Sequence, residues 1–309
     1  MDKKMIIVLV GVLLVLAGCQ QEVKTTISKP FIGGTDSIKF DFIEGAPPTE
    51  VFDGGGYPFE VTVNVENKGE FDVPKDKINI SLAGFYPPDF NNPVTTKNPD
   101  EDLDKSYIDS DGNVVPGTIT YVTFSGFNFV SNLTANNQHI IRADLCYVYG
   151  TMAQTDLCVL DDVTKTKDEV CVISEKKTVY SSSAPVQIEN FKEEVAGTDK
   201  VTFSFDIVHR GTGAVSKKDT SCSDETIDKD KVWVEVNSGL AGLKCSGLTD
   251  GTDTTGFTTL YGGKRLIRCT QDTSAQELQG KDFEKKININ AIYDYKEHKQ
   301  MNILVKHTT

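Results

Sequence analysis

The stretch that decides the fold is Phe59–Glu66, with the sequence FEVTVNVE. Apolar and polar residues alternate along it, which predicts a β-strand with one buried face and one solvated face. The turn residues of segment 67–69 (Asn-Lys-Gly) follow directly. A second run of this kind, Val201–Val208, has the sequence VTFSFDIV. When the two runs are aligned without a gap, Gly69 falls on Gly211, so the same strand and turn occur twice.

A second match strengthens this interpretation. The segment Ile141–Tyr149 aligns with Ile287–Tyr295, and both end in Tyr-x-Tyr. Continued without a gap, the alignment sets Leu157–Val159 on Ile303–Val305. Several matches in the same order indicate an internal duplication. Each half is therefore predicted to end with a Tyr-x-Tyr strand, a loop and a last short strand. The tyrosines are predicted to pack in the core with their hydroxyls at a rim, and an aromatic platform for a sugar or peptide is the alternative.

A third, looser match sets Ile78–Leu82 against Val232–Val236, and each half opens with a further short strand. Clusters of Pro, Gly and Asp separate these runs, and no stretch after residue 19 has a helical period. The pattern predicts an all-β chain of two tandem antiparallel β-sandwiches. The expected divisions are a signal peptide at 1–18, a tether at 19–30, sandwiches at 31–165 and 184–309, and a linker at 166–183.

The N-terminus predicts export. Lys3 and Lys4 precede an apolar run, Met5–Leu16, which is shorter than the roughly 20 residues of a membrane-spanning helix. The next residues, Leu16-Ala17-Gly18-Cys19, resemble the lipobox of prokaryotic lipoproteins. That resemblance implies cleavage directly before Cys19 and a diacylglycerol on its sulfur. A plain cleaved signal, or an uncleaved anchor with Cys19 incidental, are the alternatives.

The cysteine count agrees with export. The chain has seven cysteines, and lipidation of Cys19 would leave six, an even number that suits three disulfides outside the cytoplasm. Six cysteines allow about fifteen connectivities, and the sequence does not select one. The favoured set closes a short loop, joins two strand-like segments and ties the halves together: Cys158 with Cys171, Cys245 with Cys269, and Cys146 with Cys222.

Charge narrows the class of partner. The chain has 45 acidic and 32 basic side chains and a net charge of -13. Nucleic acids and anionic bilayers attract basic surfaces, so we expect no nucleic-acid partner and no membrane contact beyond the N-terminal lipid. A surface protein or a glycan remains as the expected partner.

The segment Asp109–Asn113 (DSDGN) is the one metal candidate. A calcium loop of the EF-hand type needs Gly at its sixth position and Glu at its twelfth, where this chain has Val114 and Thr120. A hairpin turn is favoured, because Asp-Gly and Gly-Asn suit positive φ. A surface calcium site built from Asp109, Asp111 and Asn113 together with the acidic segment Pro99–Asp104 is the alternative, and no other cofactor is expected.

Two sites match the N-glycosylation motif, Asn79 and Asn132, each followed two residues later by Ser or Thr. No serine lies in Gly-x-Ser-x-Gly, and none of the four histidines stands in a triad-like context, so the sequence predicts a protein without catalytic residues.

The alternating strand followed by Asn-Lys-Gly, in an exported lipoprotein, resembles the immunoglobulin-like modules of prokaryotic surface proteins, such as the CARDB-type adhesion-related domains. The layout also resembles exported archaeal proteins. The resemblance rests on pattern, since the disulfide and core Trp of antibody domains are not evident; Trp233 lies out of phase with the apolar residues beside it. It implies a cell-surface lipoprotein with a structural, adhesive or ligand-binding role. An accessory subunit of an envelope complex is the second hypothesis, and an envelope hydrolase is the third.

Overall fold

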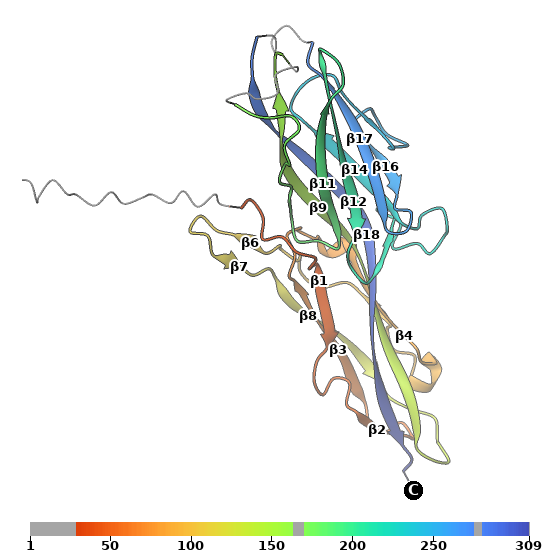
Figure 1. The fold of residues 1–309 in the computed structure, drawn as a ribbon. Coiled ribbons are helices and arrows are strands. Elements are labelled where there is room, and N and C mark those ends of the chain that lie inside the picture. Colours follow the sequence, from red (N-terminus) through yellow and green to blue (C-terminus); the bar gives the residue numbers. More distant parts are fainter. Residues whose placement is uncertain (1–28, 163–169, 275–279, 309) are drawn as a thin grey trace, which may run out of the picture.

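A computed structural model gives the fold of residues 29–162, 170–274 and 280–308 (Figure 1). These residues form strands and two short 3-10 helices, η1 (Lys75–Lys77) and η2 (Pro87–Phe90), and they contain no α-helix. The all-β prediction is therefore confirmed. None of their elements is a helix long and apolar enough to cross a membrane. The signal peptide, Cys19 and most of the expected tether lie outside the described residues.

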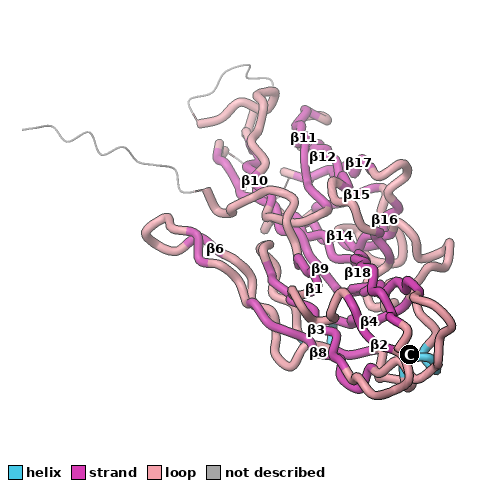
Figure 2. The backbone as a smooth tube through the Cα atoms, turned by 90° about the horizontal axis from the view of Figure 1, so that it is seen from below, coloured by secondary structure: helices cyan, strands magenta, loops and turns pink. Residues whose placement is uncertain are grey.

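The strands form two elongated sandwiches that lie end to end (Figures 1 and 2). In the first sandwich, one sheet has the order β1-β3-β8 and faces a sheet with the order β5-β4-β9-β18, to which β2 is added. The bounds are β1 (Ile38–Phe42), β2 (Glu50–Phe52), β3 (Phe59–Asn67), β4 (Ile78–Ala83), β5 (Thr96–Lys97), β8 (Ile119–Phe127), β9 (Asn137–Val159) and β18 (Phe283–Lys306). A small hairpin projects from this sandwich (Figure 2) and consists of β6 (Tyr107–Ile108) and β7 (Val114–Val115).

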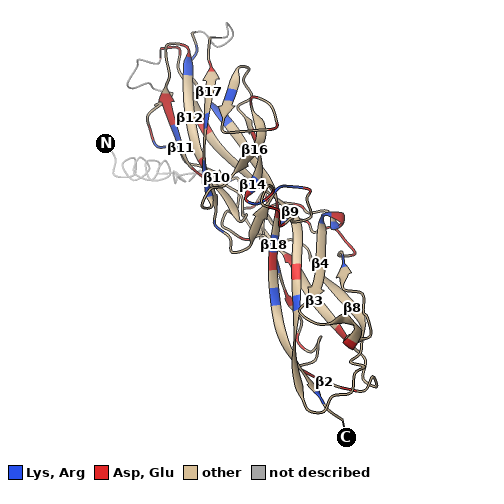
Figure 3. Ribbon diagram, turned by 90° about the vertical axis from the view of Figure 1, so that its right-hand side faces the viewer, with Lys and Arg blue, Asp and Glu red and all other residues tan. Residues whose placement is uncertain are grey.

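In the second sandwich, the sheet β11-β12-β17-β15 faces a sheet with the order β16-β14-β18-β9. Strands β10 and β13 pair with β9 and β18 respectively. The bounds are β10 (Tyr180–Ser181), β11 (Val186–Val195), β12 (Lys200–His209), β13 (Ala214–Ser216), β14 (Lys231–Asn237), β15 (Leu243–Ser246), β16 (Thr255–Thr259) and β17 (Lys264–Asp272). Acidic and basic residues are distributed along both sandwiches (Figure 3).

Strands β9 and β18 form a continuous antiparallel ribbon through both sandwiches. Their pairing runs without a break from Phe283 opposite Val159 to Val305 opposite Asn137. A strand of 24 residues such as β18 extends over roughly 80 Å. Each sandwich therefore packs its second sheet against one half of the same two strands.

The loop predicted after each Tyr-x-Tyr is wrong. The chain stays extended through residues 150–156, where the inward-facing residues Thr151, Ala153 and Thr155 are 1%, 1% and 2% exposed. Threonines at inward positions hid the period-two pattern from the sequence analysis. Thr151 satisfies its hydroxyl by donating a hydrogen bond to the Val186 carbonyl.

The strand pairing also departs from the expected division at 31–165 and 184–309. Ile303 and Val305, both 0% exposed, belong to the core of the first sandwich, where β2 pairs with β18. The last residues of β9 lie in the second sandwich. The last strand segment of each half of the chain therefore lies in the sandwich formed mainly by the other half. The described part of the expected linker, 170–183, belongs to the second sandwich and includes β10.

The duplicated residues occupy equivalent places about the middle of the ribbon. Tyr147 lies opposite Tyr295, Tyr149 lies opposite Tyr293, and Val148 lies opposite Asp294. The alignment of the two halves also sets Val148 on Asp294, so a local two-fold axis passes between these two residues. We call this region, where the sandwiches meet around the four tyrosines, the waist.

Candidate functional site

The waist is built around the four tyrosines of the two Tyr-x-Tyr segments. All four are at most 1% exposed. Their rings meet edge to face, with centroids 5.6 Å apart for Tyr147 and Tyr149, 5.8 Å for Tyr147 and Tyr295, and 6.2 Å for Tyr293 and Tyr295. Such contacts add about 0.5–1.5 kcal/mol per pair beyond area burial. The predicted core packing of these tyrosines is confirmed, and it joins the two sandwiches. The predicted position of their hydroxyls at a rim is wrong, because the second sandwich covers what would be the rim of the first.

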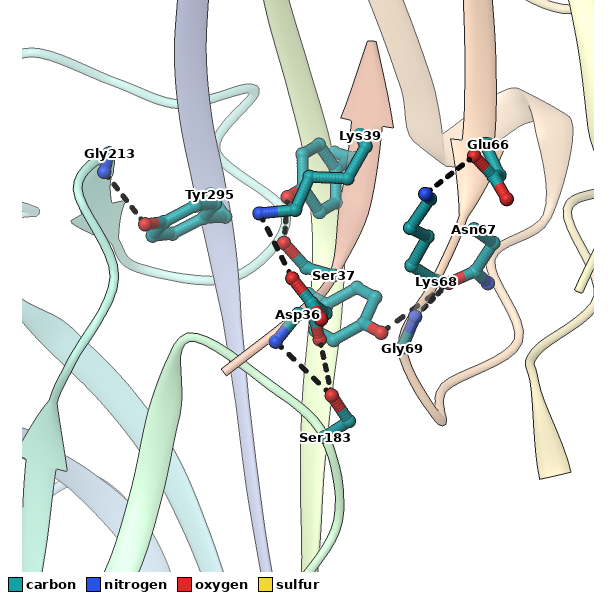
Figure 4. A network of polar contacts seen from close by, with 12 residues as sticks. Asp36, Ser37, Lys39, Glu66, Asn67, Lys68, Gly69, Ser183, Gly213 and Tyr295 are labelled. Atoms are coloured by element: carbon teal, nitrogen blue, oxygen red, sulfur yellow. Dashed lines mark hydrogen bonds and ion pairs between the residues drawn. The ribbon is translucent and has the colours of Figure 1, made fainter. Parts of the chain in front are cut away.

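The tyrosine hydroxyls are held inside the waist. The Tyr147 hydroxyl hydrogen-bonds the Ser37 hydroxyl at 2.8 Å, and the Tyr295 hydroxyl accepts from the Gly213 amide at 2.7 Å (Figure 4). The Tyr293 hydroxyl accepts from the Val186 amide at 3.2 Å. Burial raises the pKa of Tyr295 to about 12 and the pKa of Tyr293 further. The hydroxyls therefore stay protonated and neutral at physiological pH.

Two glycines allow the chain to approach the tyrosines closely. A Cβ on Gly69 would collide with the Tyr149 hydroxyl and lie 2.8 Å from the Ser183 carbonyl oxygen. A Cβ on Gly211 would collide with the Tyr295 hydroxyl. Gly69 and Gly211 are aligned in the duplication, and so are Tyr149 and Tyr295. The same steric requirement thus occurs once in each half.

Glu70 fastens the start of the described chain to the waist. This residue is 4% exposed, and its carboxylate accepts from the amides of Ile32, Gly33 and Ser183 at 2.8, 3.0 and 2.7 Å. The Ser183 hydroxyl also bonds the main chain of Asp36 (Figure 4). The chain therefore enters the molecule at its middle, with one sandwich on each side (Figure 1).

A second buried carboxylate fastens the other side of the waist. Asp294 is 1% exposed and accepts from the amides of Asp219, Thr220 and Cys222 at 2.8, 2.9 and 3.0 Å. The disulfide Cys146–Cys222 closes the same loop onto β9. Asp219 also pairs with Lys77 of the first sandwich at 2.8 Å, and this carboxylate raises the pKa of Lys77. These contacts link the two sandwiches on this side of the waist.

Replacing Cys146 and Cys222 together by serine is expected to lower the free energy of unfolding by about 4 kcal/mol, since this bridge closes a long loop in the unfolded chain. The sequence separation is 76 residues, against 24 for Cys245–Cys269. Urea unfolding of the folded, oxidised protein measures the change. The matched control replaces Cys245 and Cys269, and a larger loss there would contradict the expectation.

A groove of about 600 Å³ opens at the waist between β1, β3 and β18. We call it the waist groove. Its lysines are paired with nearby carboxylates: Lys68 with Glu66 at 3.2 Å, and Lys299 with Asp41 at 4.0 Å. Lys39 at its rim pairs with Asp36, just outside the groove, at 3.2 Å (Figure 4). Glu297 lines the groove half-buried, and burial raises its pKa. The groove is therefore polar and nearly balanced in charge.

A separate groove of about 920 Å³ lies along β11 in the second sandwich. Its floor contains Glu193, which is 5% exposed and accepts from the Cys158 amide at 3.1 Å. Burial raises the pKa of Glu193 to about 8. Lys177, also buried, lies 3.7 Å from Glu175 and 3.9 Å from Glu284.

Glu193→Gln is expected to remove a pH dependence of stability. The folded chain keeps the Glu193 proton up to about pH 8, whereas an ordinary glutamate releases it near 4.5. The parent therefore loses stability as pH rises through this range, by a few kcal/mol at most, since one pKa unit is worth about 1.4 kcal/mol. Urea unfolding at pH 5 and pH 8 measures the difference between parent and variant. The exposed neighbour Glu194→Gln is the control, and an equal pH slope in the parent and Glu193→Gln would contradict the expectation.

The calcium candidate forms a hairpin turn between β6 and β7. The Asp109 carboxylate accepts from the amides of Asp111 and Asn113 at 2.9 and 2.8 Å, and Gly112 has φ 85°. These hydrogen bonds lower the pKa of Asp109. In the described residues, no group of three or more His, Cys, Asp or Glu side chains is arranged to hold a metal ion.

The two glycosylation candidates lie in different surroundings. Asn132 is exposed on a loop of the first sandwich, and its side chain lies near Gly54. Asn79 is half-buried and lines a cavity of about 360 Å³ behind the waist together with Cys146. Access of a modifying enzyme is therefore greater at Asn132.

The six described cysteines form three disulfides, in the pairs favoured by the sequence: Cys146–Cys222, Cys158–Cys171 and Cys245–Cys269. The waist thus brings together one of these bridges with the tyrosines. The candidates Asp109 and Asn132 lie elsewhere in the first sandwich.

Three buried carboxylates carry out anchoring roles that the sequence analysis missed: Glu70, Asp294 and Asp53. Asp53 lies at the far end of the first sandwich and accepts from the Thr308 amide at 2.8 Å and the Leu133 amide at 2.9 Å. Hydrogen bonds to this carboxylate lower the pKa of Asp53, and the bond from the Thr308 hydroxyl has the largest effect. Glu70 and Asp53 lie next to glycines of turns, and Asp294 occupies a position of polar parity between Tyr293 and Tyr295, so nothing local distinguishes any of them from a solvated acidic residue.

Comparison with protein-family models gives no match to this chain, and comparison with curated proteins finds no relative in sequence.

Proposed function

We propose that this chain is an exported lipoprotein of the outer face of the cell membrane, with a non-catalytic structural, adhesive or ligand-binding role. Its two sandwiches would be immunoglobulin-like modules that present a surface to a protein or glycan partner. The observation that carries the proposal is the ribbon of β9 and β18. It runs through both sandwiches and joins them into one elongated body, which suits a display role.

The three disulfides support export, because such bridges persist in oxidising compartments and are rare in the cytosol. The net charge of -13 suits a soluble body held near an anionic membrane. No cofactor forms part of the proposal, and a calcium site at Asp109 is the alternative to it.

A lipid on Cys19 would hold the body at its middle. The described chain begins at Lys29, beside the waist, and ten extended residues span at most about 35 Å. Both sandwiches would then lie within a few tens of ångströms of the membrane, with their far ends free.

The hydrolase hypothesis needs two carboxyls, or a nucleophile and a base, in one site. The described carboxyls with a raised pKa are Glu193 and Glu297. They line different grooves, one in the second sandwich and one at the waist. This separation favours the non-catalytic role.

Mass spectrometry of the native protein tests the proposal. We expect a mature chain that begins at Cys19 and carries a diacylglycerol, and Cys19→Ala is expected to release the protein from the membrane fraction. A chain of unmodified mass, or a Cys19→Ala variant that stays with the membrane, would refute the anchor. Binding of the soluble part to whole cells or to glycans tests the adhesive role.

An accessory subunit of an envelope complex is the second candidate. An unpaired stretch of β18 at the waist groove favours it, because free strand edges are sites of assembly. Recovery of one stoichiometric partner with the full chain would support this role.

A further inference from the structure

The outer edge of β18 is unpaired where it borders the waist groove. Strand β13 pairs with β18 at residues 294–296, and β2 pairs with it at 304–306. Between them, no described strand pairs with the outer edge of residues 297–303. The groove of about 600 Å³ is lined by the first three residues of this edge, Glu297, His298 and Lys299, and the free edge continues beyond it. A strand that entered here would pair with β18 between the antiparallel strand β13 and the parallel strand β2.

The pattern of hydrogen bonds shows which main-chain groups point outward. The Leu304 amide donates to the Thr49 carbonyl at 2.8 Å, so residue 304 faces away from β9. In an antiparallel ladder the direction alternates from residue to residue, and the register here is continuous. The amides and carbonyls of His298, Gln300 and Asn302 therefore also face outward, and His298 lines the groove.

The second sandwich has a strand in the equivalent position. The alignment of the two halves sets Met152 on His298 and Ala153 on Lys299. In the second sandwich β10 pairs with β9 here, with Ser181 opposite Ala153. The Ser182 amide donates to the Met152 carbonyl at 2.8 Å. Strand β11 lies alongside β9 at this point, as β1 lies alongside β18, and it leaves room for β10.

Burial of the inward side chains shows the same contrast. Ala153 is 1% exposed beneath β10. Its counterpart Lys299 is exposed, and the flanking Glu297 and Met301 are half-buried. The slot that β10 fills in the second sandwich is thus open in the first.

We propose that the waist groove binds an extended segment of a partner polypeptide, which pairs antiparallel with His298–Asn302 as β10 pairs with β9. This inference rests on the proposed display role and names its binding site. Main-chain hydrogen bonds would supply the affinity, and the residues beside the edge would supply the selectivity.

The chemistry of the groove selects the partner. Strand β10 and the residues after it are Tyr180-Ser181-Ser182-Ser183-Ala184, so small hydroxyl side chains fit the equivalent slot. The lysines of the waist groove already have carboxylate partners, so the groove has no unpaired charge that could compensate a charged residue of the partner strand. An inward-facing lysine such as Lys299 guards an edge against unselective pairing. A cross-strand serine or threonine hydroxyl can lie beside Lys299 and Glu297 and hydrogen-bond there without adding charge. The partner is therefore an uncharged strand rich in Ser and Thr.

Amide hydrogen exchange of the full mature chain tests the proposal without a substitution. The probe is a synthetic peptide with the sequence of residues 178–184, TVYSSSA. We expect the amides of His298, Gln300 and Asn302 to exchange fast in the free chain. Saturating peptide should slow them at least tenfold, while the amides of Lys299 and Met301, which face β9, should be slow throughout.

Three results would overturn the proposal. In the first, the peptide leaves the three outward amides fast. In the second, they are slow in the free chain at every dilution, which means that the chain fills its own slot. In the third, they slow only as protein concentration rises, which means that a second copy fills it. None of these results bears on the lipid at Cys19, so the proposed anchor is tested separately.

Variants of probe and protein locate the binding site. A peptide with proline in place of its middle serine should bind about tenfold more weakly, because proline removes a main-chain donor. Gln300→Pro removes an outward amide and keeps the ladder to β9, whereas Gln300→Ala keeps the amide and is the control. Binding that is equal for both peptides would overturn the proposal even if Gln300→Pro fails to fold.

Discussion

Ile303→Asp is expected to unfold the first sandwich and to leave the second folded. Ile303 is 0% exposed and packs in the first sandwich, although it lies only six residues from the end of the chain. An unpaired carboxylate buried in this core costs about 4 kcal/mol or more. Amide exchange of β3 in the first sandwich and β12 in the second reports which of them opens.

The duplication supplies the matched variant. Leu157 aligns with Ile303, is also 0% exposed, and lies in the second sandwich. Leu157→Asp is expected to expose β12 and to spare β3, the reverse of Ile303→Asp. The exposed neighbour Asn302→Asp is the control for added charge. If Ile303→Asp opened the second sandwich instead, the two halves would not exchange strand segments and the ribbon would be wrong.

Gly69→Ala and Gly211→Ala are each expected to lower the free energy of unfolding by about 2–3 kcal/mol. Neither glycine needs positive φ, so the cost is steric. At Gly69 the new methyl group meets main-chain oxygens of Asp36 and Ser183, which cannot rotate away. At Gly211 it meets the Tyr295 hydroxyl. Thermal or urea unfolding measures both losses.

Gly56→Ala is the control, because no heavy atom lies within 4 Å of its Cβ position and no positive φ is required. Its effect should stay within about 0.5 kcal/mol. A double-variant cycle sharpens the test: Gly211→Ala should cost less in a Tyr295→Phe background, where the colliding hydroxyl is absent. Equal costs in both backgrounds would show that the close approach is unimportant for stability.

The strand content was predictable because strict alternation of apolar and polar residues is typical of a half-buried strand and does not fit the period of a helix. Phe59–Glu66 and Val201–Val208 lie in β3 and β12, within one residue of the observed bounds. The tyrosines were placed in the core because they share the parity of Leu145 and Ala291 on their strands. The local sequence pattern was enough to predict those strands that have one solvated face and one buried face.

The path of the last strands was not predictable from local pattern. Thr151 and Thr155 are polar by type but buried, and Lys299 faces inward but is exposed. Their burial depends on which sandwich covers them, and that is a tertiary property. The anchoring carboxylates Glu70 and Asp294 were missed for the same reason, since their partners are main-chain amides distant in sequence.

The unbroken ladder between β9 and β18 has a mechanical consequence. A pull along the long axis, from the waist toward either tip, would load its hydrogen bonds in shear, so that many must fail together. Two domains joined by a flexible linker would respond differently, because the linker would extend before either domain carried any force. In this protein the continuous ribbon would instead transmit the force directly between the tips and the waist, where the chain enters beside Glu70.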